Sequence, residues 1–287
     1  MSQRRIAAPI RLSSALARAE RRVAARLRHC GRLGVAISGG VDSGVLLALA
    51  VRELGPDQVV AILGVSPSLA QSERRSAHEL AAVLGVRLVE LTTDEGDVPA
   101  YRANGPDRCY HCKHALFQGI TTTVLDQEGL EAVAYGENAD DLRRPDRPGA
   151  RAATEFDVLR PLAEAGVDKF TVRKLALALE LPCADKPAAP CLASRIPHFA
   201  EVTPDKLAQV EHAEEALRCL GFRDLRVRHH GDIARIELSD DEFEKAAAEP
   251  ARTRIRAAIR AAGFRFVTLD LGGIQSGAFT LPLVDIR

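Results

Sequence analysis

One short turn, Ser38-Gly39-Gly40-Val41-Asp42-Ser43, constrains this chain more than any other feature. The run before it, Leu33–Ile37, has the apolar pattern of a buried strand, and Gly44–Leu54 after it has the pattern of a helix. Glycine lacks a Cβ and tolerates positive φ, so the turn can pass close to phosphate groups. The N–H groups and dipole of a helix start favour an anion. We therefore expect a nucleotide loop whose binding residues are Ser38, Gly39, Gly40, Asp42 and Ser43.

Asp42 indicates which nucleotide the loop binds. A carboxylate beside phosphates is unfavourable unless a divalent cation lies between them, so we expect ATP with Mg²⁺ on its pyrophosphate part. The Gly-Lys-Ser/Thr of a Walker loop does not occur in this turn. The alternative is a glycine-rich turn that binds nothing, and the complete six-residue pattern after a buried strand argues against it.

The first two thirds of the chain alternate between predicted strands and helices. The strands are expected at residues 33–37, 58–65, 86–91 and 131–135, and the helices at residues 44–54, 71–84, 116–125 and 170–179. This alternation indicates an α/β fold with a doubly wound parallel sheet covered by helices on both faces. We expect residues 1–198 to form this domain, with an amphipathic helix before the first strand and a surface loop at residues 141–151.

The pattern changes near Pro197. It predicts a long helix at residues 204–220, two strands at 224–228 and 233–238 joined by a hairpin-like turn, a helix at 241–262 broken at Pro250, and a last strand at 266–271. We expect residues 199–287 to form a smaller α+β domain for substrate binding or oligomerisation.

Composition excludes several classes of protein. Lysine plus arginine and aspartate plus glutamate each number 39, so the formal net charge is zero and gives no argument for a nucleic-acid partner. No apolar run approaches the roughly 18 residues of a membrane helix, so we expect no membrane partner. Six cysteines are too few for a disulfide scaffold and fit reduced thiols in the cytoplasm.

Three of the cysteines form a candidate metal site. Cys109 and Cys112 form a C-x-x-C pair, and Cys191 follows 79 residues later, a spacing that fits no zinc finger. Three thiolates suit one metal centre with an open position, and we favour a [4Fe–4S] cluster. The alternatives are metal-free redox or sulfur-carrying thiols, zinc, and inert core cysteines. We expect Cys183 to be a packing residue and His111 to lie in a partly exposed loop.

The turn at residues 38–43 resembles the signature of the N-type ATP pyrophosphatases, which cleave ATP between the α and β phosphates and leave AMP on a carboxylate or carbonyl oxygen. Together with residues 108–113 and 187–197, it is similar to the LarE family, the sulfur insertases of nickel-pincer nucleotide biosynthesis. Shorter matches at residues 136–138, 147–149, 226–228 and 232–238 extend the resemblance from about Leu33 to Gly273.

This resemblance implies an ATP-dependent sulfur transferase with a pyridinium mononucleotide substrate. A carboxylate of pyridinium-3,5-biscarboxylic acid mononucleotide would be adenylylated, and sulfur from a sulfide or other donor would then replace oxygen to give a thiocarboxylate. The sulfur would come from a cluster on Cys109, Cys112 and Cys191, or from Cys191 itself. We also expect a homo-oligomer.

The resemblance also assigns roles to residues. It places Asp42, Cys191 and Glu214 among the catalytic residues, and Ser194, Arg195, Arg226 and Arg228 at the substrate phosphate. A solvated strand face is the alternative for Arg226 and Arg228, and a helix-surface position is the alternative for Glu214. Two other functions compete: a cluster-dependent tRNA thiolation enzyme, which needs a broad basic surface, and a nucleotide-sensing module, which leaves the cysteines without a purpose.

Overall fold

The computed structural model describes residues 12–143 and 148–274. The chain divides into two compact units that are interleaved in sequence. Unit 1 comprises Met1–Gly64, Gln71–Thr92 and Leu116–Ala188, and unit 2 comprises Val65–Ala70, Thr93–Ala115 and Ala189–Arg287. The units are groups of segments with many internal contacts, and this division does not test the expected domain boundary at residue 198. That boundary stays a prediction.

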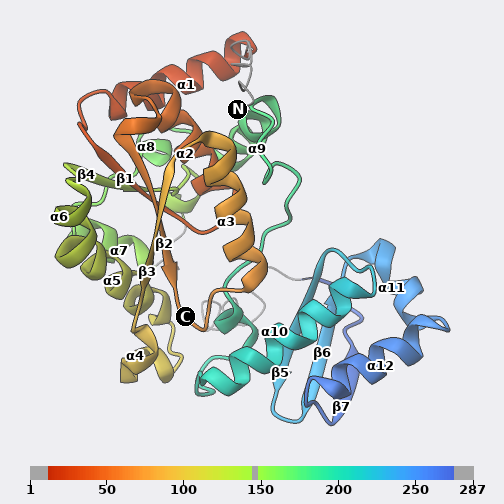
Figure 1. Cartoon of the computed structure of the whole chain (residues 1–287). Coiled ribbons are helices and arrows are strands. Elements are labelled where there is room, and N and C mark those ends of the chain that lie inside the picture. The colour runs from red at the N-terminus through yellow and green to blue at the C-terminus, as the bar shows by residue number, and fades with distance from the viewer. Residues whose placement is uncertain (1–11, 144–147, 275–287) are drawn as a thin grey trace, which may run out of the picture. The chain divides into compact units, whose positions relative to one another are not determined.

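Unit 1 is an α/β unit built on a sheet with the strand order β3-β2-β1-β4 (Figure 1). The central strand β1 (Leu33–Ile37) is buried on both faces and pairs in parallel with β2 (Val59–Val65) and β4 (Ala132–Tyr135). Figure 1 shows α2 and α3 on one side of these strands and α5 and α6 on the other. The predicted α/β class with a parallel sheet is confirmed.

The helical elements of unit 1 follow the expected alternation. They are α1 (Ser14–Leu27), α2 (Val41–Leu54), η1 (Pro56–Gln58), α3 (Gln71–Leu84), a π-helical turn η3 (Ile120–Val124), α6 (Leu125–Glu128), η4 (Asp141–Arg143), α7 (Gly149–Glu155), α8 (Pro161–Glu164) and α9 (Lys169–Ala178), and the edge strand is β3 (Arg87–Thr92). The amphipathic N-terminal helix is confirmed as α1, whose buried residues are Ala19, Val23, Ala24 and Leu27.

Unit 2 combines a small sheet with the segments that carry the cysteines. The sheet has the order β5-β6-β7, with β5 and β6 antiparallel and β6 and β7 parallel. Its elements are η2 (Glu95–Asp97), α4 (Pro99–Arg102), η5 (Leu192–Arg195), α10 (Pro204–Cys219), β5 (Leu225–His230), β6 (Ile233–Leu238), α11 (Asp240–Ala247), α12 (Ala251–Ala261) and β7 (Phe266–Leu269).

The core of this sheet lies between one of its faces and the helices. Val227, Ala234 and Ile236 point to the same face and pack with residues of α10 and α12, such as Leu217 and Ile259. Because side chains alternate across a strand, Arg226, Arg228 and Glu237 belong to the opposite face.

In the part of the chain that the structure describes, no helix is long and apolar enough to cross a membrane.

Two local predictions are wrong. Helix α5 spans Arg108–Gly119, so it begins eight residues earlier than expected and His111 lies on a helix instead of in a loop. The turn Gly105-Pro106-Asp107 precedes it, and the carbonyl of Asp107 accepts from the N–H of Tyr110 at 2.8 Å. The expected surface loop at residues 141–151 contains η4 and the start of α7, with residues 144–147 outside the described residues.

Candidate functional site

The nucleotide loop lies at the carboxyl end of β1, where α2 begins. Gly39 has a φ of +74°, and a Cβ there would lie 2.5 Å from the carbonyl oxygen of Glu73, so a glycine is required. Gly40 is the N-cap of α2 and has no side chain to cap the helix. The Ser43 hydroxyl accepts from the N–H of Ser38 at 3.2 Å. The loop therefore leaves N–H groups at the start of α2 for an anion.

Asp42 lies in the first turn of α2, where two other segments of unit 1 contact its carboxylate. Asn138, from the segment after β4, donates from Nδ2 to Oδ1 of Asp42 at 3.2 Å. The Lys169 ammonium, from the first residue of α9, forms an ion pair with Oδ2. Gly136 makes this approach possible, because a Cβ there would lie 2.5 Å from the backbone nitrogen of Ser43.

A second lysine contacts the loop from the other side. Lys186 donates from Nζ to the carbonyl oxygen of Gly39 at 3.1 Å and pairs with Glu73 of α3 at 2.9 Å. Its ammonium group adds positive charge beside the turn. Sequence reasoning missed Lys169 and Lys186 as members of the site, because both come from segments more than 100 residues away.

Cys109 and Cys112 lie at the start of α5 in unit 2. Cys109 is exposed, whereas Cys112 is partly buried against a cluster that includes Tyr101 and Leu192. Burial raises the pKa of the Cys112 thiol, and the negative charges of Glu95, Cys191 and Cys109 raise it further. Leu192 follows Cys191 directly in the sequence and belongs to the cluster against which Cys112 packs, so the fold brings the segment of Cys191 near the C-x-x-C pair.

Two buried side chains hold these cysteine segments together. Arg108 donates from Nη1 to Asn104 Oδ1 at 2.7 Å and to the carbonyl of Ala193 at 2.9 Å. The Asn104 amide donates to the carbonyls of Ile196, Pro197 and Ala200 at 3.2, 2.7 and 3.0 Å. Asn104 is fully buried, and its φ of +55° is one that asparagine tolerates. Only the structure reveals this role of Asn104.

Glu95 adds a buried carboxylate to the neighbourhood of the cysteines. Its Oε1 accepts from the hydroxyls of Ser66 and Ser68 at 2.5 and 3.1 Å, and its Oε2 has no hydrogen-bond partner among the described residues. Across residues 12–143 and 148–274, no group of three or more His, Cys, Asp or Glu side chains is arranged to hold a metal ion. The iron–sulfur cluster therefore stays a prediction.

Cys183 is buried in unit 1 beside Gly44 of α2, which confirms its packing role.

The expected phosphate-binding residues of unit 2, Ser194, Arg195, Arg226 and Arg228, lie in an ionic network with Glu214 and Glu237. These six residues are here called the arginine region. Arg195 donates from Nε to Glu214 Oε1 at 2.8 Å and from Nη2 to Oε2 at 3.3 Å. Burial alone would raise the pKa of Glu214, but Arg195, Arg218 and the N–H of Val227 outweigh burial and lower it. Glu214 is 1% exposed, so the helix-surface alternative is wrong.

The second pair of the arginine region joins strands β5 and β6. Arg228 donates from Nε and Nη2 to the two oxygens of Glu237, both at 2.9 Å, and from Nη1 to the carbonyl of Ser194 at 2.9 Å. Arg226 and Arg228 are each 4% exposed, so a solvated strand face is excluded for both. Burial lowers the pKa of Arg226, and the positive charges of Arg195 and Arg228 lower it further. The carboxylates of Glu237 and Asp224 act on this pKa in the opposite direction.

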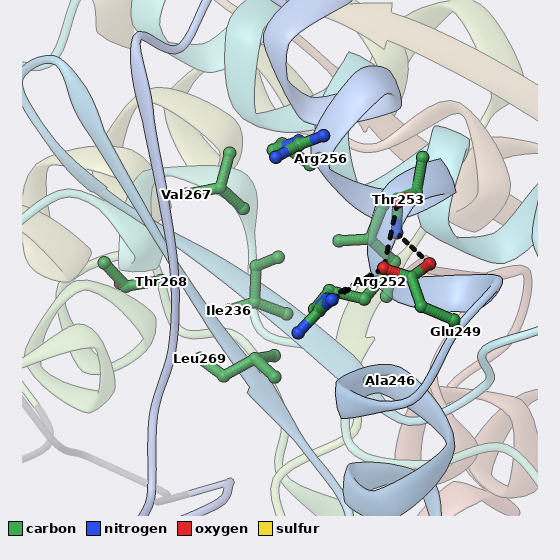
Figure 2. Close-up of a pocket in the computed structure, with 10 residues that line it drawn as sticks. Ile236, Ala246, Glu249, Arg252, Thr253, Arg256, Val267, Thr268 and Leu269 are labelled. Carbon is green, nitrogen blue, oxygen red and sulfur yellow. Dashed lines mark hydrogen bonds and ion pairs between the residues drawn. The ribbon is translucent and has the colours of Figure 1, made fainter.

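A separate cavity of about 520 Å³ opens beside α12 and β7 in unit 2 (Figure 2). Ile236, Val267 and Leu269 supply apolar lining, and Glu249 accepts hydrogen bonds from Arg252 and Thr253 on its polar side. None of the residues expected to bind nucleotide, phosphate or metal lines this cavity.

Comparisons with known proteins place the chain among ATP-using enzymes. The asparagine synthase family model matches residues 13–118, which include the nucleotide loop. The uncharacterized protein slr1717 of Synechocystis sp. is 41% identical over 85% of this chain and 90% of its own length.

Two further relatives cover most of the chain. The pyridinium-3,5-bisthiocarboxylic acid mononucleotide synthase of Lactiplantibacillus plantarum is 37% identical over 88% of this chain and 90% of its own length. The uncharacterized protein MJ0830 of Methanocaldococcus jannaschii is 31% identical over 72% of this chain and 77% of its own length.

Proposed function

Since the chain belongs to the LarE family of ATP-dependent sulfurtransferases, we propose that it adenylylates a carboxylate of pyridinium-3,5-biscarboxylic acid mononucleotide and replaces oxygen by sulfur. The match to the L. plantarum synthase across 88% of the chain is the observation that carries the proposal. It covers the nucleotide loop, the three cysteines and the arginine region together.

Adenylylation solves a chemical problem of the substrate. A carboxylate is a poor electrophile because its leaving group would be oxide. When a carboxylate oxygen attacks the α-phosphorus of ATP, the bond to the β-phosphate breaks, pyrophosphate leaves, and the carboxyl carbon gains AMP as a leaving group. The N–H groups at the start of α2 and the ammonium of Lys186 would stabilise the phosphates.

Asp42 is the residue that would hold Mg²⁺. Its carboxylate supplies the hard oxygen ligands that Mg²⁺ prefers, and its side chain is 23% exposed, so a hydrated ion can reach it. When bound, Mg²⁺ would neutralise the pyrophosphate as it departs.

The arginine region would hold the phosphate of the mononucleotide. Arg195 and Arg228 direct their forks at Glu214 and Glu237, which fixes the geometry of the network. The arginine region contains three arginines and two glutamates, and guanidinium groups suit phosphate oxygens bidentately. In this arrangement Glu214 acts by orienting Arg195. Its expected role among the catalytic residues stays a prediction.

Cys109, Cys112 and Cys191 would hold a [4Fe–4S] cluster. Three thiols from two segments of unit 2, which meet where Cys112 packs against the cluster that contains Leu192, fit such a donor set. Arg108 donates towards Cys109 Sγ at 3.9 Å. When bound, the cluster would supply an open iron position for sulfide from an external donor. In the rival design, the Cys191 thiol is consumed as the sulfur source.

Iron analysis combined with intact-mass spectrometry tests the sulfur source. With a cluster, Cys109→Ala, Cys112→Ala and Cys191→Ala each lose iron, the brown chromophore and sulfur transfer, while pyrophosphate release persists. Cys219→Ala, at an exposed cysteine of α10, is the matched control and should keep all three. Loss of about the mass of H₂S from Cys191 after reaction, or full activity of Cys109→Ala, would contradict the cluster.

We further propose that the enzyme is a cytoplasmic homo-oligomer. The alternative of tRNA thiolation has less support, because the formal net charge is zero. RNA that copurifies with the protein and becomes thiolated would support the alternative, whereas ATP–pyrophosphate exchange that depends on the pyridinium mononucleotide would exclude it.

A further inference from the structure

The contact between Asp42 and Lys169 has a consequence for how the nucleotide loop accepts its metal. Both oxygens of the Asp42 carboxylate are engaged, one by the amide of Asn138 and the other by the ammonium of Lys169. A metal ion that binds this carboxylate therefore competes with these two donors for its oxygens.

Asn138 is the partner that is held in place. Its side chain also donates to Asp141 Oδ2 at 2.9 Å and accepts from the N–H groups of Asp140 and Asp141 at 2.9 and 3.3 Å. It is 2% exposed. Removing its amide from Asp42 would break a network that shapes the segment after β4.

Lys169 is the partner that can leave. Its backbone is fixed, since its N–H donates to Asp140 Oδ2 at 2.9 Å and Asp168 caps α9 by accepting from the N–H of Thr171 at 2.8 Å. Its side chain is 36% exposed and ends in a flexible ammonium that requires no particular direction of approach. The ammonium can therefore move without any change in α9.

The position of Lys169 argues for such a role. A cation at the first residue of a helix opposes the helix dipole, so a lysine there is unfavourable unless nearby acids compensate. Asp140 and Asp168 also lie at this helix start, but the ion pair of the Lys169 ammonium is with Asp42 of the nucleotide loop. By contrast, Lys186 is already engaged by Glu73 and by a backbone carbonyl, and it does not contact Asp42 in the described structure.

We propose that Lys169 is the counter-ion of Asp42 in the nucleotide-free enzyme, and that Mg²⁺ takes its place when MgATP binds, which releases the ammonium group to the phosphates. This inference rests on the proposed function, because it takes Asp42 as the carboxylate that holds Mg²⁺. Lys169 thereby prevents futile capture of a metal by the empty loop and adds a phosphate contact once the nucleotide arrives.

The exchange predicts that Lys169→Met changes two affinities in opposite directions. The nucleotide-free variant should bind Mn²⁺ about fivefold more tightly than the wild type, because an exposed ion pair contributes a free energy of about this size. Binding is measured by the loss of the electron paramagnetic resonance signal of free Mn²⁺. The Mg²⁺ complex of α,β-methylene ATP, which cannot be cleaved at that bond, should bind about five- to tenfold more weakly by calorimetry. Lys169→Arg, which keeps the charge, and Lys174→Met, at an exposed lysine of the same helix, should match wild type in Mn²⁺ binding.

A purely structural role of Lys169 would not separate the two affinities. If Lys169→Met weakens both, or leaves the Mn²⁺ affinity unchanged, the exchange is overturned. Asp42→Asn distinguishes this failure from failure of the proposed function. If Asp42→Asn loses Mn²⁺ from the nucleotide complex while Lys169→Met leaves the Mn²⁺ affinity unchanged, the exchange is wrong but Asp42 still binds the metal. If the nucleotide complex of Asp42→Asn keeps Mn²⁺, Asp42 does not bind the metal and the exchange is wrong as well.

Discussion

The nucleotide loop of unit 1 is one continuous turn of backbone, whereas the arginine region of unit 2 is a network of side chains from four elements, η5, α10, β5 and β6. The loop uses glycines and the N–H groups of a helix start, and its carboxylate and lysines remain partly exposed. The arginine region buries two ion pairs, Arg195–Glu214 and Arg228–Glu237, in which each side chain is at most 4% exposed.

This difference predicts that substitutions in the two regions affect different properties of the protein. Exposed charges at the loop can exchange partners at little cost, so substitutions there should alter ligand and metal binding while the fold persists. A buried ion pair that loses one partner leaves an uncompensated charge in a poorly polarisable environment. Substitutions in the arginine region should therefore affect both substrate binding and stability.

The largest effect is expected at the loop. Asp42→Asn should leave the fold intact and reduce pyrophosphate release by a factor on the order of 10²–10³, because the metal loses its carboxylate. A coupled pyrophosphate assay measures this, with circular dichroism to check folding. A folded Asp42→Asn protein that releases pyrophosphate at the wild-type rate would contradict the assignment of Asp42.

The next effect is on stability in unit 2. Glu237→Gln leaves the buried guanidinium of Arg228 without its carboxylate and should lower the free energy of unfolding by about 3–5 kcal/mol. Chemical denaturation measures the loss. Glu90→Gln is the control, because Glu90 forms exposed ion pairs with Arg74 and His78, and it should unfold like the wild type. Equal losses in the two variants would remove the distinction between buried and exposed pairs.

A smaller effect is expected on substrate binding. Arg226→Ala should weaken binding of the pyridinium mononucleotide by ~1.5–3 kcal/mol, the range of a lost charge-assisted contact, and leave ATP affinity nearly unchanged. Calorimetric titration of both ligands measures this, with Arg254→Ala at an exposed position of α12 as control. Unchanged substrate affinity in Arg226→Ala would show that this arginine does not bind the phosphate.

The smallest effect concerns acid sensitivity. The pKa of Glu214 is lowered in the folded state, so its contribution to stability is present above the unfolded pKa of about 4.3 and is lost as the pH falls through the lower folded pKa. Below about pH 4.3 the stability of Glu214→Gln should therefore fall less steeply than that of the wild type. Denaturation at several pH values measures the slope, and Glu244→Gln, at an exposed glutamate of α11, should keep the wild-type slope.

The sequence by itself determined those features that depend on neighbouring residues. The apolar run Leu33–Ile37, the turn with its two glycines and the helix after it specify the β1–loop–α2 unit, because strand period, glycine conformation and helix start are local properties. The alternation of strands and helices likewise predicted the α/β class and most element bounds within a few residues. The start of α5 was missed, since its only local sign is the Gly105-Pro106-Asp107 turn.

Only the tertiary structure decided which charged residues are buried and what each one pairs with. Glu214 on a helix and Arg228 on a strand have the sequence pattern of surface residues, yet both are buried because each finds a partner from another segment. The ties from Asn104 to Pro197 and from Lys169 to Asp42 join residues 93 and 127 positions apart. Burial and pairing depend on which distant segments come into contact, and no local sequence pattern specifies such a contact.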